Sequence, residues 1–219
     1  MKTARNATAD HTIMPSDTPI ESWEDYYKKT GARPPRETLL FALDKFEAER
    51  PDNAEPLRAI DLGCGNGRDT VELLRRGWQV FAVDAEQSAI DGLRARDEVG
   101  DDVLLETATS RFEGIELPES ELINSSFALP LVSPQDFPDL WDHMLMALAP
   151  GGRISCQLYG DRDSWVGKPG ITFFAHSAID ALLYPLNVEY FREEEDDSTT
   201  PRGQQKHWHI YHMVVQRPY

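Results

Sequence analysis

The sequence predicts an α/β fold in which a mostly parallel sheet carries helices on both faces. Short apolar runs alternate with segments whose apolar residues recur at helical spacing, and this alternation is typical of parallel sheets. A glycine-rich loop, IDLGCGNGRDT at residues 60–70, lies at the end of the first of these runs. Because 219 residues suffice for one sizeable core, we expect a flexible tail over residues 1–20 and a single domain over residues 21–219.

The predicted elements begin with two helices. SWEDYYKKTG (22–31) and RETLLFALDKF (36–46) are separated by Pro34 and Pro35, which end one helix and begin the next. Strands follow at 57–63, 78–84, 102–108, 121–129 and 153–160, with helices after the first, second and fourth. After a further helix at 177–185, strands at 187–191 and 207–215 can form a wide antiparallel hairpin. The five acids at 193–197, in the connection of this hairpin, are typical of a solvated loop.

The charge of the chain argues against polyanionic partners. There are 22 Lys and Arg against 38 Asp and Glu, and the resulting surface, with a net charge of −16, repels nucleic acid and anionic membranes. Residues 1–20 lack the apolar core of a signal peptide, and no apolar stretch approaches the ~18 residues that span a bilayer. Cys64 and Cys156 lie in the glycine loop and in an apolar run, a usage that fits a reducing compartment. We therefore expect a cytoplasmic protein.

The glycine loop indicates a cofactor that carries a nucleoside. Glycine serves where a backbone turns tightly or lies against a ligand. The dinucleotide fingerprint G-x-G-x-x-G is absent, because Arg68 follows Gly67, and the acids Asp61 and Asp69 disfavour a pyrophosphate. A zwitterion suits the loop better, with its ammonium group near Asp61 and its carboxylate on free backbone N–H groups. Asp84, at the end of the next strand, can accept hydrogen bonds from a ribose diol. An amino acid, a ribose and a purine together describe S-adenosylmethionine.

The segment IDLGCGNGRDT, followed by VFAVDAE, resembles the cofactor-binding signature of class I S-adenosylmethionine-dependent methyltransferases. GCGNGRDT is especially similar to the small tellurite-resistance-type members. The resemblance covers the chain from about Glu21 onward and implies a Rossmann-like, seven-stranded sheet. Its last strand is antiparallel and lies between the fifth and the sixth. Taken alone, a G-x-G-x-G loop is weak evidence, so Asp61, Asp84 and the two-strand ending carry much of the resemblance.

The same resemblance implies a set of cofactor-binding residues. Asp61 and the glycines of the loop would surround the methionine moiety, and Asp84 would hold the ribose. Asn124 and Ser125 would line the floor beneath the reacting methyl group. Many family members carry an Asp that faces adenine, but this chain reads ETATSRFEG there. Adenine recognition is therefore expected from a backbone contact and from Phe112 packing on the purine, although Phe112 could equally be a core residue. The expected cofactor-binding set is Asp61, Gly63, Cys64, Gly65, Gly67, Arg68, Asp84, Ala85, Phe112, Asn124, Ser125 and Tyr27.

Substrate contacts are expected from segments that overhang the carboxyl ends of the strands, where ligands bind in such sheets. The loop GDRDSW at 160–165 suggests a lid, although an Asp–Arg pair that stabilises a surface turn explains it nearly as well. In HWHIYH, His207 and His209 share one face of a strand and His212 faces the other way. Two imidazoles do not make a catalytic zinc site, so no metal is expected. The expected substrate-binding residues are Trp23, Tyr26, Phe127, Asp161, Trp165, His207 and His209.

The function predicted from the sequence is therefore methyl transfer from S-adenosylmethionine to a small molecule, in a monomer or homodimer. A chain of this length has little beyond the core with which to grip a macromolecule. Two alternatives stay open: a module that binds the cofactor without turnover, and a nicotinamide-dependent oxidoreductase, which the missing third glycine disfavours. The residues do not identify a catalytic base or the acceptor atom. The acidic surface favours neutral or cationic acceptors over an oxyanion such as tellurite.

Overall fold

The computed structural model describes residues 33–50, 55–100, 103–200 and 203–219. The predicted tail, the first predicted helix, and the candidates Trp23, Tyr26 and Tyr27 lie outside the described residues. The helices are α2 (Glu37–Glu49), α3 (Arg68–Arg75), α4 (Gln87–Arg94), the 3₁₀ turn η1 (Leu129–Leu131), α5 (Phe137–Ala147) and α6 (His176–Leu183). The strands are β1 (Arg58–Leu62), β2 (Gln79–Asp84), β3 (Leu105–Thr109), β4 (Ser120–Ser125), β5 (Leu148–Gly160), β6 (Phe173–Phe174), β7 (Asn187–Thr199) and β8 (Gln205–Gln216).

The strands form one sheet in the order β3-β2-β1-β4-β5-β8-β7, and the two-residue strand β6 also pairs with β5. Neighbouring strands from β3 to β5 are parallel, whereas β8 is antiparallel to both β5 and β7. The last strand of the chain, β8, therefore lies between β5 and β7. This arrangement confirms the predicted α/β fold and its antiparallel final strand.

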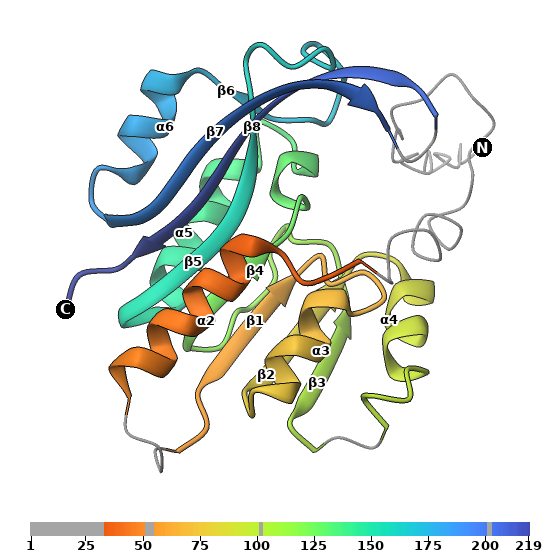
Figure 1. The fold of residues 1–219 in the computed structure, drawn as a ribbon, viewed down its shortest axis with the longest axis vertical. Coiled ribbons are helices and arrows are strands. Elements are labelled where there is room, and N and C mark those ends of the chain that lie inside the picture. Colours follow the sequence, from red (N-terminus) through yellow and green to blue (C-terminus); the bar gives the residue numbers. More distant parts are fainter. Residues whose placement is uncertain (1–32, 51–54, 101–102, 201–202) are drawn as a thin grey trace, which may run out of the picture.

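Helices cover both faces of this sheet (Figure 1). On one face α5 and α6 pack on the strands, and Phe137, Met144 and Ile179 belong to the same buried cluster as the β5 residue Cys156. On the other face α2, α3 and α4 enclose a second buried cluster that includes Val214 of β8. In α2, Leu39, Leu43 and Phe46 are buried, whereas Asp44 and Glu47 are exposed. Two apolar layers of this kind fix the sheet between the helices.

The predicted solvated loop at 193–197 is wrong, because these acids belong to β7. The strand runs from Asn187 to Thr199 and pairs with β8 over nearly its whole length. An edge strand with charged side chains is stable when cross-strand partners and solvent satisfy the charges, and β7 is the edge of the sheet. The predicted strand at 121–129 is in turn too long, since β4 ends at Ser125. In the part of the chain that the structure describes, no helix is both long and apolar enough to cross a membrane.

Candidate active site

The glycine loop connects β1 to α3 with three left-handed glycines. Gly63, Gly65 and Gly67 have φ angles of 73°, 54° and 88°, a region that side chains disfavour. The amides of Gly63 and Cys64 donate to the Val83 carbonyl at 2.8 and 3.0 Å, and the amide of Gly67 donates to the Cys64 carbonyl at 3.0 Å. These amides are thus used inside the protein. The expectation that the loop amides are free for a ligand carboxylate does not hold for these three.

Two of the three glycines are also required by contacts within the protein. A Cβ atom on Gly63 would lie 2.2 Å from the Cβ of Ala128, and one on Gly67 would lie 2.2 Å from Cδ1 of Leu93. Both distances are far below van der Waals contact, so the loop packs tightly against the segment after β4 and against α4. The ring of Phe112 is 3.5 Å from the same hypothetical Cβ of Gly63, which places Phe112 beside the loop.

Asp84 at the end of β2 is bonded to the glycine loop. Its side chain is buried, and Oδ2 accepts a 2.9 Å hydrogen bond from the amide of Gly65. The other oxygen, Oδ1, accepts from the amide of Glu86 at 3.0 Å. The carboxylate is therefore held in one orientation at the carboxyl edge of the sheet, where β1 and β2 lie side by side. Ala85, which follows it, is exposed at the same edge.

Asp61 at the end of β1 is the centre of a buried polar network. Thr70 Oγ1 donates to its Oδ2 at 2.6 Å, and Asn124 Nδ2 donates to its Oδ1 at 2.9 Å. Burial, together with the neighbouring Asp69 carboxylate, raises the pKa of Asp61 from 3.8 to about 7. Asp61 can therefore change its charge near neutral pH, and an ammonium group placed beside it would favour the ionised form.

The second acid of the loop, Asp69, fastens three elements together. Its carboxylate accepts from the Arg68 guanidinium at 2.9 and 2.7 Å, from the hydroxyl of Ser126 after β4, and from the backbone amide of Arg36 before α2. Burial opposes ionisation of Asp69, but the hydrogen bonds and charge of Arg68 outweigh it and hold the pKa below its ordinary value. Asp69 is thus a fixed anion in the first turn of α3, where the helix dipole favours one.

Asn124 and Ser125 join β4 to β1 beneath this network. The hydroxyl of Ser125 donates to the Leu62 carbonyl at 3.0 Å. Both side chains are fully buried, and in the described structure Oδ1 of Asn124 has no hydrogen-bond partner. A buried acceptor without a partner is costly, so it marks a place where a donor from a ligand or a water molecule fits.

Phe127 lies directly after β4 in a strained conformation. With a φ of 62° it is the only described residue other than glycine in the left-handed region. Its ring has the Arg36 guanidinium 4.4 Å from its centroid, and the rings of Tyr159 and His212 lie 6.2 and 6.1 Å away. Strain of this kind persists only where surrounding contacts enforce it, and it concentrates at functional sites. Phe127 therefore lies between Arg36, Tyr159 of β5 and His212 of β8.

The loop predicted to be a lid is anchored to β8 by Asp163. Asp163 and Lys206 form a buried ion pair, and the Lys206 ammonium lies 4.0 Å from the Trp165 ring centroid and 4.2 Å from that of Trp208. Asp161, the acid expected to bind substrate, is about half exposed and lies 3.7 Å from Nδ1 of His209. Aromatic faces attract cations, so these contacts together with the ion pair fasten the loop to β8.

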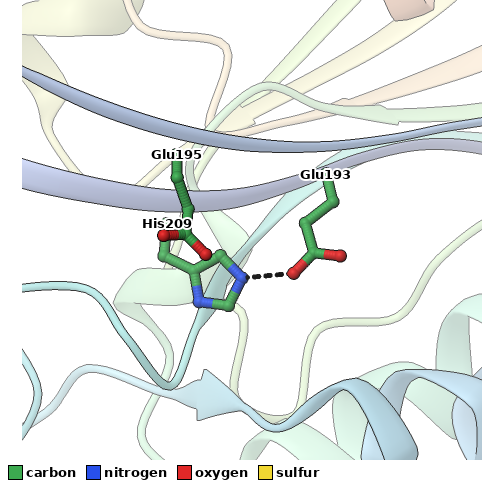
Figure 2. Close-up of side chains that lie close together, drawn as sticks. All are labelled: Glu193, Glu195 and His209. Carbon is green, nitrogen blue, oxygen red and sulfur yellow. Dashed lines mark hydrogen bonds and ion pairs between the residues drawn. The ribbon is translucent and has the colours of Figure 1, made fainter.

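His209 and two acids of β7 form the cluster shown in Figure 2, in which Glu193 and Glu195 converge on the imidazole. Ligand atoms of these three residues lie within 4.8 Å of one another, a spacing that a metal ion could bridge. However, the guanidinium of Arg162 forms ion pairs with both glutamates, at 2.6 Å from Glu193. Arg162 thus supplies the positive charge that the acids require.

The hydrogen bonds of His209 also determine its tautomer. Nδ1 accepts from the backbone amide of Arg162 at 3.0 Å, so Nε2 carries the proton and donates to Glu193 Oε1 at 2.8 Å. A metal ligand must offer a lone pair, and neither nitrogen does so in this arrangement. His207 lies on the same face against Asp197 at 2.9 Å. His207 and His209 are thus bonded to acids of β7. The histidine that contacts Phe127 is His212, which was not among the residues predicted from the sequence.

The comparisons with known proteins agree with this geometry. Residues 59–152, which include the glycine loop, Asp84, Asn124 and Phe127, match a family model described as "Methyltransferase domain". This segment is therefore similar to a methyltransferase domain. The matched segment is less than half of the chain, and it contains the loop, both acids and the strand end that the sequence identified. The predicted resemblance to methyltransferases is thereby confirmed over these residues.

Proteins similar to this chain come from several bacteria. Over 60 residues it is 42% identical to a magnesium-protoporphyrin O-methyltransferase of Rhodobacter capsulatus, and these residues are 26% of this chain and 27% of that protein. TehB from Haemophilus influenzae superimposes with a TM-score of 0.70 at 18% identity, over 89% of this chain and 67% of that chain. The N-methyltransferase NodS from Bradyrhizobium japonicum, solved with S-adenosyl-L-homocysteine, has a TM-score of 0.62 at 16% identity, over 91% of this chain and all of that one. The two solved structures show the shared fold.

Proposed function

We propose that this protein transfers the methyl group of S-adenosylmethionine to a small-molecule acceptor and releases S-adenosylhomocysteine. The observation that carries the proposal is the bond from Gly65 to Asp84, which joins the glycine loop to the acid that would bind ribose. Both lie at the carboxyl edge of adjacent parallel strands, where ligands bind in open α/β sheets. The fit to the family model over the same residues supports this assignment.

The residues of this edge fit the parts of the cofactor. An ammonium group suits the buried pair of Asp61 and Asn124, because the unpartnered Oδ1 of Asn124 can accept a hydrogen bond. The ribose hydroxyls suit Asp84, and the apolar ring of Phe112 suits the purine. When bound, the cofactor supplies an electrophilic methyl group on a sulfonium. The rest of the proposed set is Gly63, Cys64, Gly65, Gly67, Arg68, Ala85, Ser125 and Tyr27, the last of which lies outside the described residues.

The acceptor is proposed to bind where Phe127 meets the ends of β5 and β8. An aromatic cluster of Phe127, Tyr159, Trp165 and Trp208 lies there, and it suits an organic molecule better than an oxyanion. Of the sequence-predicted substrate residues, Phe127 and Trp165 belong to this surface. Displacement at a sulfonium is in-line, so the contribution of these side chains is to hold the nucleophile close, aligned and dry.

We further propose a cytoplasmic protein that acts as a monomer or homodimer without nucleic-acid partners. Both cysteines, Cys64 and Cys156, are buried and free, which suits a reducing compartment. The net charge of −16 opposes binding to phosphate backbones.

The experiment that tests the proposed activity is a screen with methyl-labelled S-adenosylmethionine. Phenols, amines, thiols and tellurite are offered as acceptors, and transfer of label is measured for the wild type and for Asp84→Ala. We expect label in at least one organic acceptor, with the rate strongly reduced in the variant. If S-adenosylhomocysteine binds but no acceptor is labelled, the module that binds the cofactor without turnover becomes the better description.

A further inference from the structure

His212 stands apart from the other two histidines of β8. His207 and His209 point to the face where the β7 acids and Arg162 satisfy them. His212 points to the opposite face, which it shares with the neighbouring Gln157 of β5 in the strand register. Its side chain is only 7% exposed, and Nε2 has no hydrogen-bond partner in the described structure. A buried imidazole with an unsatisfied nitrogen requires an explanation.

The surroundings of His212 place it at the acceptor side of the proposed site. Its ring meets the ring of Phe127 edge-on, with centroids 6.1 Å apart and an interplanar angle of 82°. Phe127 is the strained residue that follows β4, and its ring also lies near Tyr159 of the aromatic cluster. The imidazole therefore lies next to the surface on which an aromatic acceptor would pack.

Charged groups from two elements surround the imidazole and nearly balance one another. From the start of α2 come Arg36 and Glu37, whose Oε1 lies 3.9 Å from Nδ1 of His212. From β7 come Arg192 and Glu194, whose Oε2 lies 3.2 Å from Nε2 without the geometry of a hydrogen bond. Burial, aided by the Arg192 guanidinium, lowers the pKa of His212 from 6.5 to about 4. At neutral pH the imidazole is uncharged and keeps one lone pair.

Resting on the function proposed above, we propose that His212 is a catalytic residue that accepts the hydrogen bond, and then the proton, of a hydroxyl group on an aromatic acceptor. The acceptor oxygen forms a bond to the methyl carbon while the carbon–sulfur bond breaks and its electron pair returns to sulfur. The O–H proton passes to an imidazole nitrogen and later to solvent. Once oxygen carries the methyl group, its proton is far more acidic than an imidazolium, so a weakly basic histidine suffices. The acceptor class is thus a phenol-like hydroxyl compound.

Two variants separate hydrogen bonding from proton transfer. His212→Gln keeps an acceptor atom but cannot take a proton, whereas His212→Phe keeps only the ring. We expect His212→Phe to reduce methyl transfer to phenols by about 10²-fold or more. His212→Gln should retain the KM for the phenol and lose kcat. The matched control is His143→Gln on α5, which should leave both parameters unchanged. S-adenosylhomocysteine affinity should stay at the wild-type value in all three variants, which also shows that they fold.

A second measurement needs no turnover. In protein with isotopically labelled histidine, the His212 resonance is assigned by its loss in His212→Gln, and then followed by NMR as phenol, catechol or 1-naphthol is added with S-adenosylhomocysteine present. We expect the His212 signal to shift and the His143 signal to stay. The proposal is overturned if His212→Phe methylates phenols at the wild-type rate, or if none of these phenols perturbs His212. Failure of S-adenosylhomocysteine to bind the wild type would instead reject the function on which the proposal rests.

Discussion

The amide of Gly65 donates to Oδ2 of Asp84 across 2.9 Å, so the glycine loop after β1 and the acid at the end of β2 form one structural unit. Without this bond the two would be separate features on neighbouring strands. With it, a change at the acid alters both its own contacts and the position of the loop.

The first prediction concerns Asp84→Ala. The variant should bind S-adenosylmethionine and S-adenosylhomocysteine more weakly by a similar factor, because each ligand loses the same ribose contacts. Charge-assisted hydrogen bonds contribute about 1.5–3 kcal/mol each, so even one lost bond corresponds to roughly tenfold or more in affinity. Asp97→Ala, a change at an exposed acid, is the matched control and should bind like the wild type. Equal affinity of wild type and Asp84→Ala in calorimetry contradicts the assignment.

The second prediction separates backbone strain from steric contact in the loop. Gly67 and Gly114 have φ angles of 88° and 73°, but an added Cβ meets Leu93 at 2.2 Å only at Gly67. Gly114→Ala should therefore cost about 1–2 kcal/mol of stability from left-handed strain alone. Gly67→Ala should cost a further ~1–3 kcal/mol because the core must move. Urea unfolding measures both, and equal losses would show that the contact with Leu93 relaxes freely.

Gly65→Val forms the third prediction. Because Gly65 lies between the two packing glycines and bonds to Asp84, a branched side chain at its left-handed φ of 54° should disturb the ligand-binding edge. We expect loss of S-adenosylhomocysteine binding in a protein that still unfolds cooperatively. Wild-type affinity in the folded variant would show that the loop is a turn without a ligand.

Asp61 makes the stability of the protein depend on pH in a defined window. Its pKa is raised from 3.8 to about 7, so between these values the folded state holds a proton that the unfolded state has lost. Stability from this group is therefore fully present below pH 3.8 and is lost as the pH rises through about 7. The pKa of Asp69 is lowered, so its protonation changes the stability of the protein only at pH values below the range in which Asp61 does so.

The fourth prediction is that Asp61→Asn flattens this pH dependence. The amide can keep the bond from Asn124 and can donate to the Thr70 hydroxyl, which is free to rotate. Relative to the variant, the wild type should lose on the order of 2–4 kcal/mol of unfolding free energy between pH 4 and 7. Denaturant unfolding at several pH values measures it. Parallel curves for the two proteins would mean that Asp61 ionises normally.

The fifth prediction is that Arg162 makes a metal unnecessary. Tag-free protein treated with a chelator should keep its melting temperature and its affinity for S-adenosylhomocysteine. Arg162→Gln leaves Glu193, Glu195 and His209 without the guanidinium and should gain measurable Zn²⁺ binding, while Arg162→Lys should not. About one equivalent of tightly bound zinc in the wild type, lost together with stability on chelation, would contradict the prediction.

Much of the fold could be predicted from local patterns. The alternation of apolar runs and helical segments is encoded residue by residue, so the sheet and its antiparallel last strand agree with expectation. The acidic segment at 193–197 could not be read in this way, because its strand conformation depends on distant partners such as His209 of β8 and Arg162 of the loop after β5. Tertiary contacts of this kind override the intrinsic secondary-structure preference of a segment.

The candidate site was predictable only in part. Asp61, the glycines and Asp84 are adjacent to strand ends, so their place at one edge follows from a parallel sheet. The role of His212 was not predictable, because it depends on the φ of Phe127 and on which strand covers each face. The alternation of HWHIYH already separates His212 from His207 and His209. It does not reveal which of the two faces meets the end of β4.

We propose above all that Asp61, the glycine loop and Asp84 form a site for S-adenosylmethionine. Isothermal titration calorimetry with S-adenosylhomocysteine and with NADH tests it most directly, because the two ligands share an adenosine but only the first brings an amino-acid end. We expect that S-adenosylhomocysteine binds, that Asp84→Ala weakens this binding, and that NADH gives no heat of binding. Micromolar binding of NADH with no response to S-adenosylhomocysteine would contradict it.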